Sequence, residues 1–143
     1  MYTYEYPRPA VTTDAVVFAR EDSKLYVLLI KRGRPPFEGM WALPGGFLDM
    51  DEELEDGVKR ELGEETGLTG VDLKQFHTYG TIGRDPRHRT ISVAFAGVIE
   101  KPAEVKGDDD AAEAKWFPVD DLPPLAFDHE EIIKDALKEL EVR

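Results

Sequence analysis

The sequence predicts a domain of the α/β class, or α+β in some schemes, built on a mixed β-sheet. Segments rich in β-branched and aromatic residues alternate with two segments of helical periodicity, and this interleaving favours a mixed sheet that carries helices. The 143 residues, of which 41% are hydrophobic, fit one domain that spans residues 1–143 and buries its own core.

The first part of the chain predicts a strand at residues 11–19, a turn at 20–23 and a second strand at 24–31. A loop at 33–39 and a short extended piece at 41–44 are predicted to follow. The first strand is rich in Val, Thr and Phe, and the second is its expected partner. The loop carries two prolines and two glycines, which interrupt regular structure. The extended piece is expected to end at a turn formed by Gly45 and Gly46.

The clearest helical pattern follows this turn. Leu54, Val58 and Leu62 recur at four-residue spacing, so they are expected to lie on one face and point to the core. Asp51 is the expected N-cap, and Gly67 is expected to end the helix in a left-handed conformation.

The second half predicts strands at residues 71–80 and 90–99, followed by a loop at 102–112. A short strand at 114–119 and a closing amphipathic helix at 129–140 complete the prediction. An arginine-rich segment at residues 83–89 separates the first two of these strands. The apolar spacing of the last segment is typical of a helix that packs one face on a core.

Charge and cysteine content exclude several functions. Eighteen basic and 30 acidic residues give a net charge of −12, so a general basic surface for nucleic acid is not expected. With no cysteine, the chain has no disulfide scaffold, thiolate metal site or cysteine nucleophile. No stretch is long and apolar enough to predict a membrane span, and the first residues lack the order of a signal peptide, so we expect a cytoplasmic protein without membrane contact.

Three carboxylates in the first helix break local rules of helix stability. At 100° per residue, Glu61, Glu64 and Glu65 share one face, where they repel one another near the helix C-terminus. Gly57, one turn earlier, costs about 1 kcal/mol relative to alanine. A solvated acidic face is one interpretation, and a site for a hard divalent cation with oxygen ligands is the other.

The spacing around these glutamates decides between the two. Nine residues fit the pattern Gly-x5-Glu-x7-Arg-Glu-U-x-Glu-Glu-x-Gly-U, where U is bulky and apolar: Gly46, Glu52, Arg60, Glu61, Leu62, Glu64, Glu65, Gly67 and Leu68. The pattern resembles the Nudix hydrolase signature at every defined position. The resemblance implies a single Nudix hydrolase domain over residues 1–143, with a mixed sheet sandwiched between helices.

The resemblance also implies a metal site for Mg²⁺, with Mn²⁺ as the alternative. The ligands carried over to this chain are the Gly45 carbonyl, Glu61, Glu64 and Glu65. Arg60 lies one turn before Glu64 and is expected to hold that carboxylate, and Glu52 is expected to act in support at the helix entry. The catalytic residues implied are Arg60, Glu61 and Glu64, together with a general base.

The general base is left open. In this family it sometimes comes from a later loop, where Asp109, Asp110 and Glu113 are candidates. Glu113 is favoured because it directly precedes the predicted strand at residues 114–119, and the alternative is an ordinary solvated acid.

The substrate is expected to be a small nucleotide. The segment that contains Arg84, Arg87 and Arg89 resembles the corresponding part of the ADP-ribose pyrophosphatase subgroup, and these side chains could hold a phosphate, unless they only offset local acidic charge. A proline fifteen residues past the motif is associated with ADP-ribose specificity, but Gly83 stands there and Pro86 follows three residues later. Aromatic residues that could stack on the base are Phe37, Trp41 and Phe127.

These features favour metal-dependent hydrolysis of a nucleoside diphosphate linked to another group, with ADP-ribose cut to AMP and ribose 5-phosphate. The alternatives are a nucleoside triphosphate pyrophosphohydrolase that removes damaged nucleotides and a non-catalytic nucleotide-sugar sensor. A sensor is expected to have an eroded motif and an added DNA-binding domain, for which little chain follows the last helix. The oligomeric state is open, a homodimer included.

Overall fold

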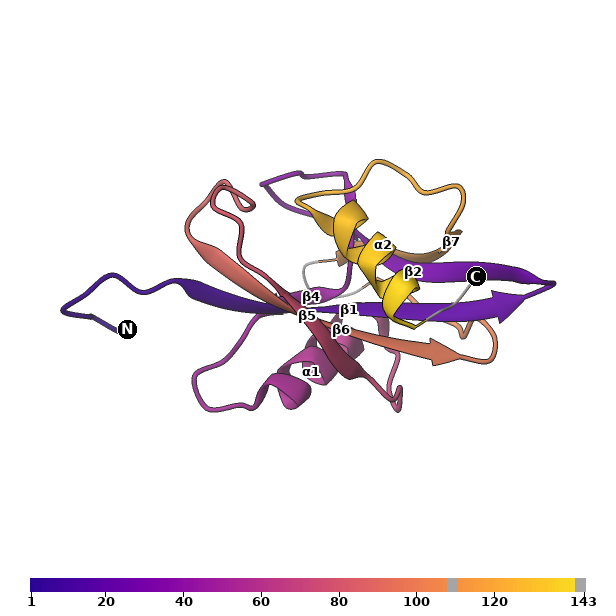
Figure 1. Cartoon of the computed structure of the whole chain (residues 1–143), viewed down its shortest axis with the longest axis horizontal. Helices are drawn as coiled ribbons and strands as arrows, with labels where there is room; N and C mark the ends of the chain where they lie inside the picture. Colours follow the sequence, from indigo (N-terminus) through magenta and orange to yellow (C-terminus); the bar gives the residue numbers. More distant parts are fainter. Residues whose placement is uncertain (108–110, 141–143) are drawn as a thin grey trace.

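The computed structural model describes residues 1–107 and 111–140 (Figure 1). Its elements are β1 (Ala10–Glu21), β2 (Lys24–Arg32), β3 (Trp41–Ala42), β4 (Gly45–Phe47), α1 (Leu54–Thr66), β5 (Lys74–Tyr79), β6 (Thr90–Ile99), β7 (Ala111–Pro118) and α2 (His129–Glu139). The described residues therefore contain the strands and the two helices that the sequence predicts, in the predicted order.

The strands form a mixed sheet with β1 at its centre. Among the described residues the main order is β3-β2-β1-β6-β5, while β4 also pairs with β1 and β7 with β2. β1 and β6 run parallel from Ala10↔Thr90 to Ala19↔Ile99, and the other pairings are antiparallel. Asp22 and Ser23, both with positive φ, close the tight turn from β1 to β2.

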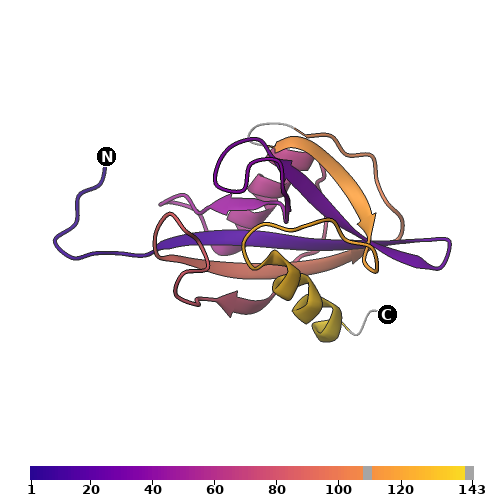
Figure 2. The same ribbon diagram turned by 90° about the horizontal axis from the view of Figure 1, so that it is seen from above.

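The two helices cover opposite faces of the sheet (Figures 1 and 2). Alternate side chains of β1 point to opposite sides, so that Val17 joins the core under α1 while Val16 and Phe18 join the core under α2. Val58 and Leu62 of α1 are buried in the first core, which confirms the predicted inner face of that helix. The mixed α/β fold with helices on both faces is therefore confirmed.

The start of α1 differs from the prediction. Gly57 donates its N–H to the Glu53 carbonyl, so Glu53 and not Asp51 is the N-cap, and the cap has no side-chain hydrogen bond. The helix ends as predicted at Gly67, whose φ is 78°. Gly45 and Gly46 do not form a turn either, because they belong to β4 and pair with Asp14 and Thr13.

Two strands have different bounds from those predicted. β5 begins at Lys74, because residues 71–73 bury Val71 and Leu73 without ladder pairing. These residues cross so close to Gly97 that a Cβ there would lie 2.5 Å from the Asp72 carbonyl oxygen. β7 begins at Ala111, earlier than expected, because it pairs with β2 up to Arg32.

Neither helix in the described chain has the length and apolar character that a membrane crossing needs.

Candidate active site

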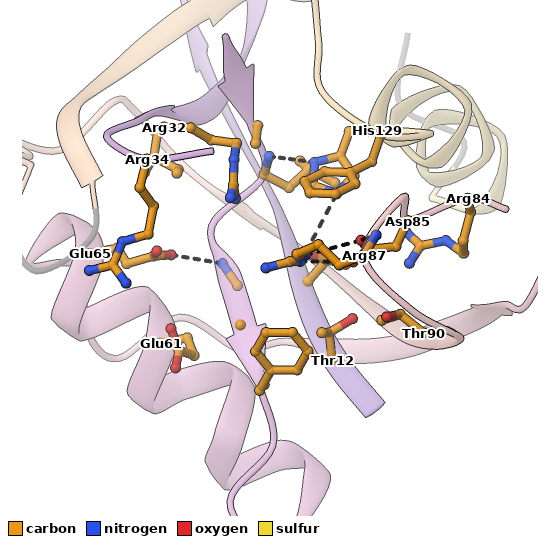
Figure 3. A pocket seen from close by; sticks show the side chains of 18 residues that line it. Thr12, Arg32, Arg34, Glu61, Glu65, Arg84, Asp85, Arg87, Thr90 and His129 are labelled. Carbon is orange, nitrogen blue, oxygen red and sulfur yellow. Dashed lines mark hydrogen bonds and ion pairs between the residues drawn. The ribbon is translucent and has the colours of Figure 1, made fainter. Parts of the chain in front are cut away.

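A pocket of about 300 Å³ opens beside β4, between α1 and the loops that precede β6 and α2 (Figure 3). One wall carries Glu61 and Glu65 of α1. The other carries Arg84, Asp85 and Arg87. The fold thus brings the predicted carboxylate helix and the predicted arginine segment to opposite sides of one cavity.

The carboxylate wall is built against the backbone of β4. Glu65 is buried, and its Oε1 accepts the N–H of Gly45 at 2.8 Å. The N–H and C=O of one strand residue point to the same side, so the Gly45 carbonyl also faces α1. Glu61 lies so close to Gly46 that a Cβ there would come within 2.6 Å of its Oε2. Only glycine at position 46 leaves room for this carboxylate.

Arg60 ties the acidic residues together. Its guanidinium donates to Glu52 at 2.8 and 3.0 Å, to Glu61 at 2.7 Å and to Glu64 at 3.0 Å. The hydrogen bond from Arg60 lowers the pKa of Glu52 to about 2, and the Glu52 and Glu61 carboxylates raise the pKa of Arg60. Arg60 therefore reduces the repulsion among the glutamates. Its contact with Glu64 is the one that the sequence predicts, and it also binds Glu52.

Gly57 allows the loop before α1 to pack on the helix. A Cβ at this position would lie 2.7 Å from Leu48 Cδ1 and 3.1 Å from Glu52 Oε1. Glu52 also accepts the N–H of Asp49 at 2.9 Å, which fixes its carboxylate beside Arg60. The cost of a glycine inside α1 thus has a structural reason.

The carboxylate wall fits a hard divalent cation. Glu61, Glu65 and the Gly45 carbonyl offer only oxygen donors, which suit Mg²⁺. Among the described residues, no group of three or more acidic or histidine side chains is placed so that it could hold a metal ion. A cation bound here would have fewer side-chain ligands, and water or substrate phosphate would have to complete its coordination. Glu64 has 46% of its side chain exposed, against 14% for Glu61, and does not line the pocket.

The arginine wall consists of two ion pairs. Arg84, with 4% of its side chain exposed, binds both carboxylate oxygens of Asp128 at 2.6 and 2.9 Å. Burial lowers the pKa of Arg84, but the hydrogen bond and the charge of Asp128 raise it, and the net shift is upward. Arg87 forms a bidentate pair with buried Asp85 at 2.8 and 3.0 Å, and despite burial this pair lowers the Asp85 pKa to about 2. Arg87 keeps 35% of its side chain exposed toward the pocket.

Phe127 stands between the arginines. Its ring lies 5.1 Å from the Arg32 guanidinium and 5.8 Å from that of Arg87, and it meets the edge of Phe37 at 4.8 Å. Its φ of 54° is rare for a bulky residue and places the ring on the pocket wall. Of the three predicted aromatic residues, only Phe127 lines the pocket. Phe37 packs on Phe127, and Trp41 packs on Phe117 against the core.

The pocket residues that were not predicted from the sequence include Asp14, Arg32, Arg34 and His129. His129 is buried at the start of α2, and this burial lowers its pKa. Asp14 is buried on β1, where it accepts a hydrogen bond from the Ser92 hydroxyl. The sequence offered one signal for Asp14: this acidic residue stands inside a predicted apolar strand, between Thr13 and Ala15.

Arg89 and Glu113, like Arg60 and Glu64, are predicted site residues that do not line the pocket. Arg89 is exposed and donates to the Gly80 carbonyl at 2.6 Å. Glu113 is exposed on β7, opposite Lys31, and its role as general base stays a prediction. The other candidates for the base, Asp109 and Asp110, lie outside the described residues.

Comparison with known proteins gives consistent matches. A NUDIX domain model matches residues 8–136. The chain is 46% identical over 134 residues to the ADP-ribose pyrophosphatase of Methanocaldococcus jannaschii, covering 93% of this chain and 76% of that protein. It is 32% identical over 140 residues to the ADPR responsive transcriptional repressor NtrR of Acinetobacter baylyi, covering 95% of this chain and 56% of that protein.

A solved structure is similar over nearly the whole chain. The NUDIX domain of Shewanella oneidensis NrtR, complexed with ADP ribose, matches with a TM-score of 0.89 and 36% identity. The match covers 94% of this chain and 90% of that one. The names of all three similar proteins thus refer to ADP-ribose: one is a pyrophosphatase, one is a repressor that responds to it, and one is a domain in complex with it.

Proposed function

The chain belongs to the Nudix domain family, and we propose that it hydrolyses ADP-ribose to AMP and ribose 5-phosphate. In this reaction water adds to one phosphorus of the diphosphate, the P–O–P bond breaks, and each product keeps one phosphate. As is general for Nudix hydrolases, the reaction uses a divalent metal, which we propose is Mg²⁺.

The observation that carries this proposal is the charge arrangement of the pocket. One wall presents the Glu61 and Glu65 carboxylates, and the facing wall presents Arg87 (Figure 3). The Arg87 guanidinium lies 5.8 Å from the Phe127 ring. A diphosphate flanked by a base and a sugar needs a cation at its phosphates and separate contacts for its ends. The two walls supply these two functions.

The roles of the site residues follow from their contacts. Glu61, Glu65 and the Gly45 carbonyl would hold the cation, and we propose Glu64 as a further ligand. When bound, the cation neutralises the phosphates and lowers the pKa of the attacking water. Arg60 holds Glu61 in place through its hydrogen bond. Arg87 and Phe127 would bind the substrate, while Arg84 supports that wall through Asp128.

The test is turnover of a substrate panel with Mg²⁺: ADP-ribose, NADH, diadenosine polyphosphates and deoxynucleoside triphosphates, with the phosphate products identified. We expect ADP-ribose to have the highest kcat/KM, with AMP and ribose 5-phosphate as the products. Preferred turnover of triphosphates would support the alternative of a nucleotide-sanitising enzyme. Tight ADP-ribose binding without turnover would support a sensor, for which the repressor relative is the precedent.

The arginine wall predicts a substrate effect. Arg87→Ala is expected to lower kcat/KM for ADP-ribose by about tenfold or more, because one charge-assisted contact is lost. Arg84→Ala is expected to lower it as well, through the loss of the Asp128 pair. Arg89→Ala removes the same charge from the same segment but outside the pocket, and it should have little effect. Equal kinetics in all three variants would contradict this assignment.

The carboxylate wall predicts stabilisation by metal. Mg²⁺ or Mn²⁺ at 100 times its dissociation constant should stabilise the protein by about 2.7 kcal/mol, which would raise Tm. The triple variant Glu61→Gln, Glu64→Gln, Glu65→Gln should lose most of this rise. Thermal unfolding with and without metal measures it, and equal shifts in both proteins would place the cation elsewhere.

The remaining sequence predictions stay proposals. We propose a single Nudix domain over residues 1–143 and a cytoplasmic location, and the choice between monomer and homodimer stays open. Binding of a small nucleotide, and not of nucleic acid, remains our expectation for the net charge of −12.

A further inference from the structure

His129 connects α2 to the strand that carries the metal site. It is the first residue of α2, and its side chain is 6% exposed. Its Nδ1 accepts the backbone N–H of Leu43 at 2.9 Å, across 86 residues of sequence (Figure 3). Leu43 lies two residues before Gly45, whose carbonyl is a proposed metal ligand.

The hydrogen bond defines the state of the ring. A ring nitrogen that accepts an N–H carries no proton, so the neutral imidazole bears its proton on Nε2. Nε2 lies 3.8 Å from Oδ1 of Asp14, and the other oxygen of this carboxylate accepts a hydrogen bond from the Ser92 hydroxyl. The ring is therefore placed between β1 and the segment that leads into β4.

The segment from Leu43 to Gly45 is fixed at three successive residues. His129 holds the Leu43 N–H, β1 binds the Pro44 carbonyl through Ala15 N–H at 2.8 Å, and Glu65 accepts the Gly45 N–H. A Cβ on Gly45 would lie 2.1 Å from the Thr13 carbonyl oxygen, so the segment is packed tightly on β1. His129 is the anchor of this segment on the side opposite α1.

We propose that His129 is a positioning residue for the metal site, and that its Nδ1 sets the place of the Gly45 carbonyl through the Leu43 N–H. This inference rests on the proposed function. His129 lines the pocket, and in this proposal it acts on the metal site through the Leu43 backbone. Outer contacts that orient metal ligands commonly change metal affinity by about tenfold or more when they are removed.

The test compares two variants of similar shape. His129→Asn keeps an acceptor on Cγ where Nδ1 stands, and His129→Leu has the same branching without the acceptor. We expect the Leu variant to bind Mn²⁺, measured by electron paramagnetic resonance of free Mn²⁺, about tenfold more weakly than the Asn variant. The Mg²⁺ concentration for half-maximal hydrolysis should rise in parallel.

A matched control loosens α2 without touching Leu43. The Tyr79 hydroxyl donates to Asp135 of α2 at 2.7 Å, so Tyr79→Phe should lower Tm and leave Mn²⁺ affinity unchanged. If the Leu variant does not fold, His129→Gln takes its place. The acceptor of glutamine lies one bond farther out, so this variant should bind Mn²⁺ as weakly as we expect for the Leu variant.

The outcomes separate the inference from the proposed function. Equal Mn²⁺ affinity in the Asn variant and the variant that lacks the acceptor would overturn the role of Nδ1. A change in Mn²⁺ affinity for Tyr79→Phe as large as that for His129→Leu would also overturn it, because general loosening of α2 would then suffice. A wild-type protein that binds no Mn²⁺ and leaves ADP-ribose intact would overturn the proposed function itself.

Discussion

Glu61→Gln is expected to lower metal-dependent hydrolysis of ADP-ribose by at least about 100-fold, because it removes a charged ligand from the pocket wall. The glutamine oxygen can still accept the hydrogen bond from Arg60, so α1 and its acidic contacts should persist. Removing one of several like charges should leave Tm equal to that of wild type or slightly higher. Steady-state kinetics at saturating Mg²⁺ and thermal unfolding measure the two effects.

The control for this variant lies on the same helix. Glu55→Gln makes the same charge change at an exposed residue in the first turn of α1, away from the pocket. Its kinetics should match those of wild type. Full turnover by Glu61→Gln, or an equal loss in Glu55→Gln, would show that the net charge of the helix matters and not a ligand at position 61.

The metal side of the site could be predicted from sequence because it is local. A helix repeats every 3.6 residues, so the spacing of Glu61, Glu64 and Glu65 is enough to place them on a common face. The motif spacing also placed Arg60 within reach of Glu64, which the structure confirms at 3.0 Å. Even here, periodicity did not reveal that Glu64 is largely exposed while Glu65 is buried against Gly45.

The rest of the pocket depends on contacts between distant segments. Leu43 and His129 meet only because the segment before α2 packs along β3, where Ala126 N–H donates to the Trp41 carbonyl at 2.8 Å. Arg84 is paired with Asp128, 44 residues away, and a sequence pattern does not contain that pairing. Predicting these contacts requires the sheet order, in which β1 runs parallel to β6.

The wrong local predictions have a common cause. Asp51 has the side chain of a good N-cap, but the loop before α1 is held by Glu52 and Arg60, and the helix begins two residues later. The glycine pair at 45 and 46 has the composition of a turn, but the close approach of Thr13 and Glu61 requires glycine in a strand. In both cases tertiary packing overrides the local preference.

The two glycines of β4 give the second large prediction. Gly46→Ala should lower hydrolysis by about 10- to 100-fold, because its Cβ would stand 2.6 Å from Glu61 Oε2 and must displace that carboxylate. The displaced atoms are the end of a flexible side chain, so the backbone can stay in place and Tm should change little. Gly45→Ala should instead lower Tm strongly, because its Cβ would meet the Thr13 carbonyl oxygen at 2.1 Å and the Asp14 Cα at 3.0 Å.

The contrast between these two variants tests the geometry of the carboxylate wall. Kinetics, Mn²⁺ affinity and thermal unfolding should separate them: Gly46→Ala folds but binds Mn²⁺ weakly, whereas Gly45→Ala is destabilised throughout. Gly46→Ser, with one more atom on the same Cβ, should be at least as inactive as Gly46→Ala. A Gly46→Ala protein with wild-type Mn²⁺ affinity and kcat would mean that hydrolysis does not need the Glu61 carboxylate where it lies against β4.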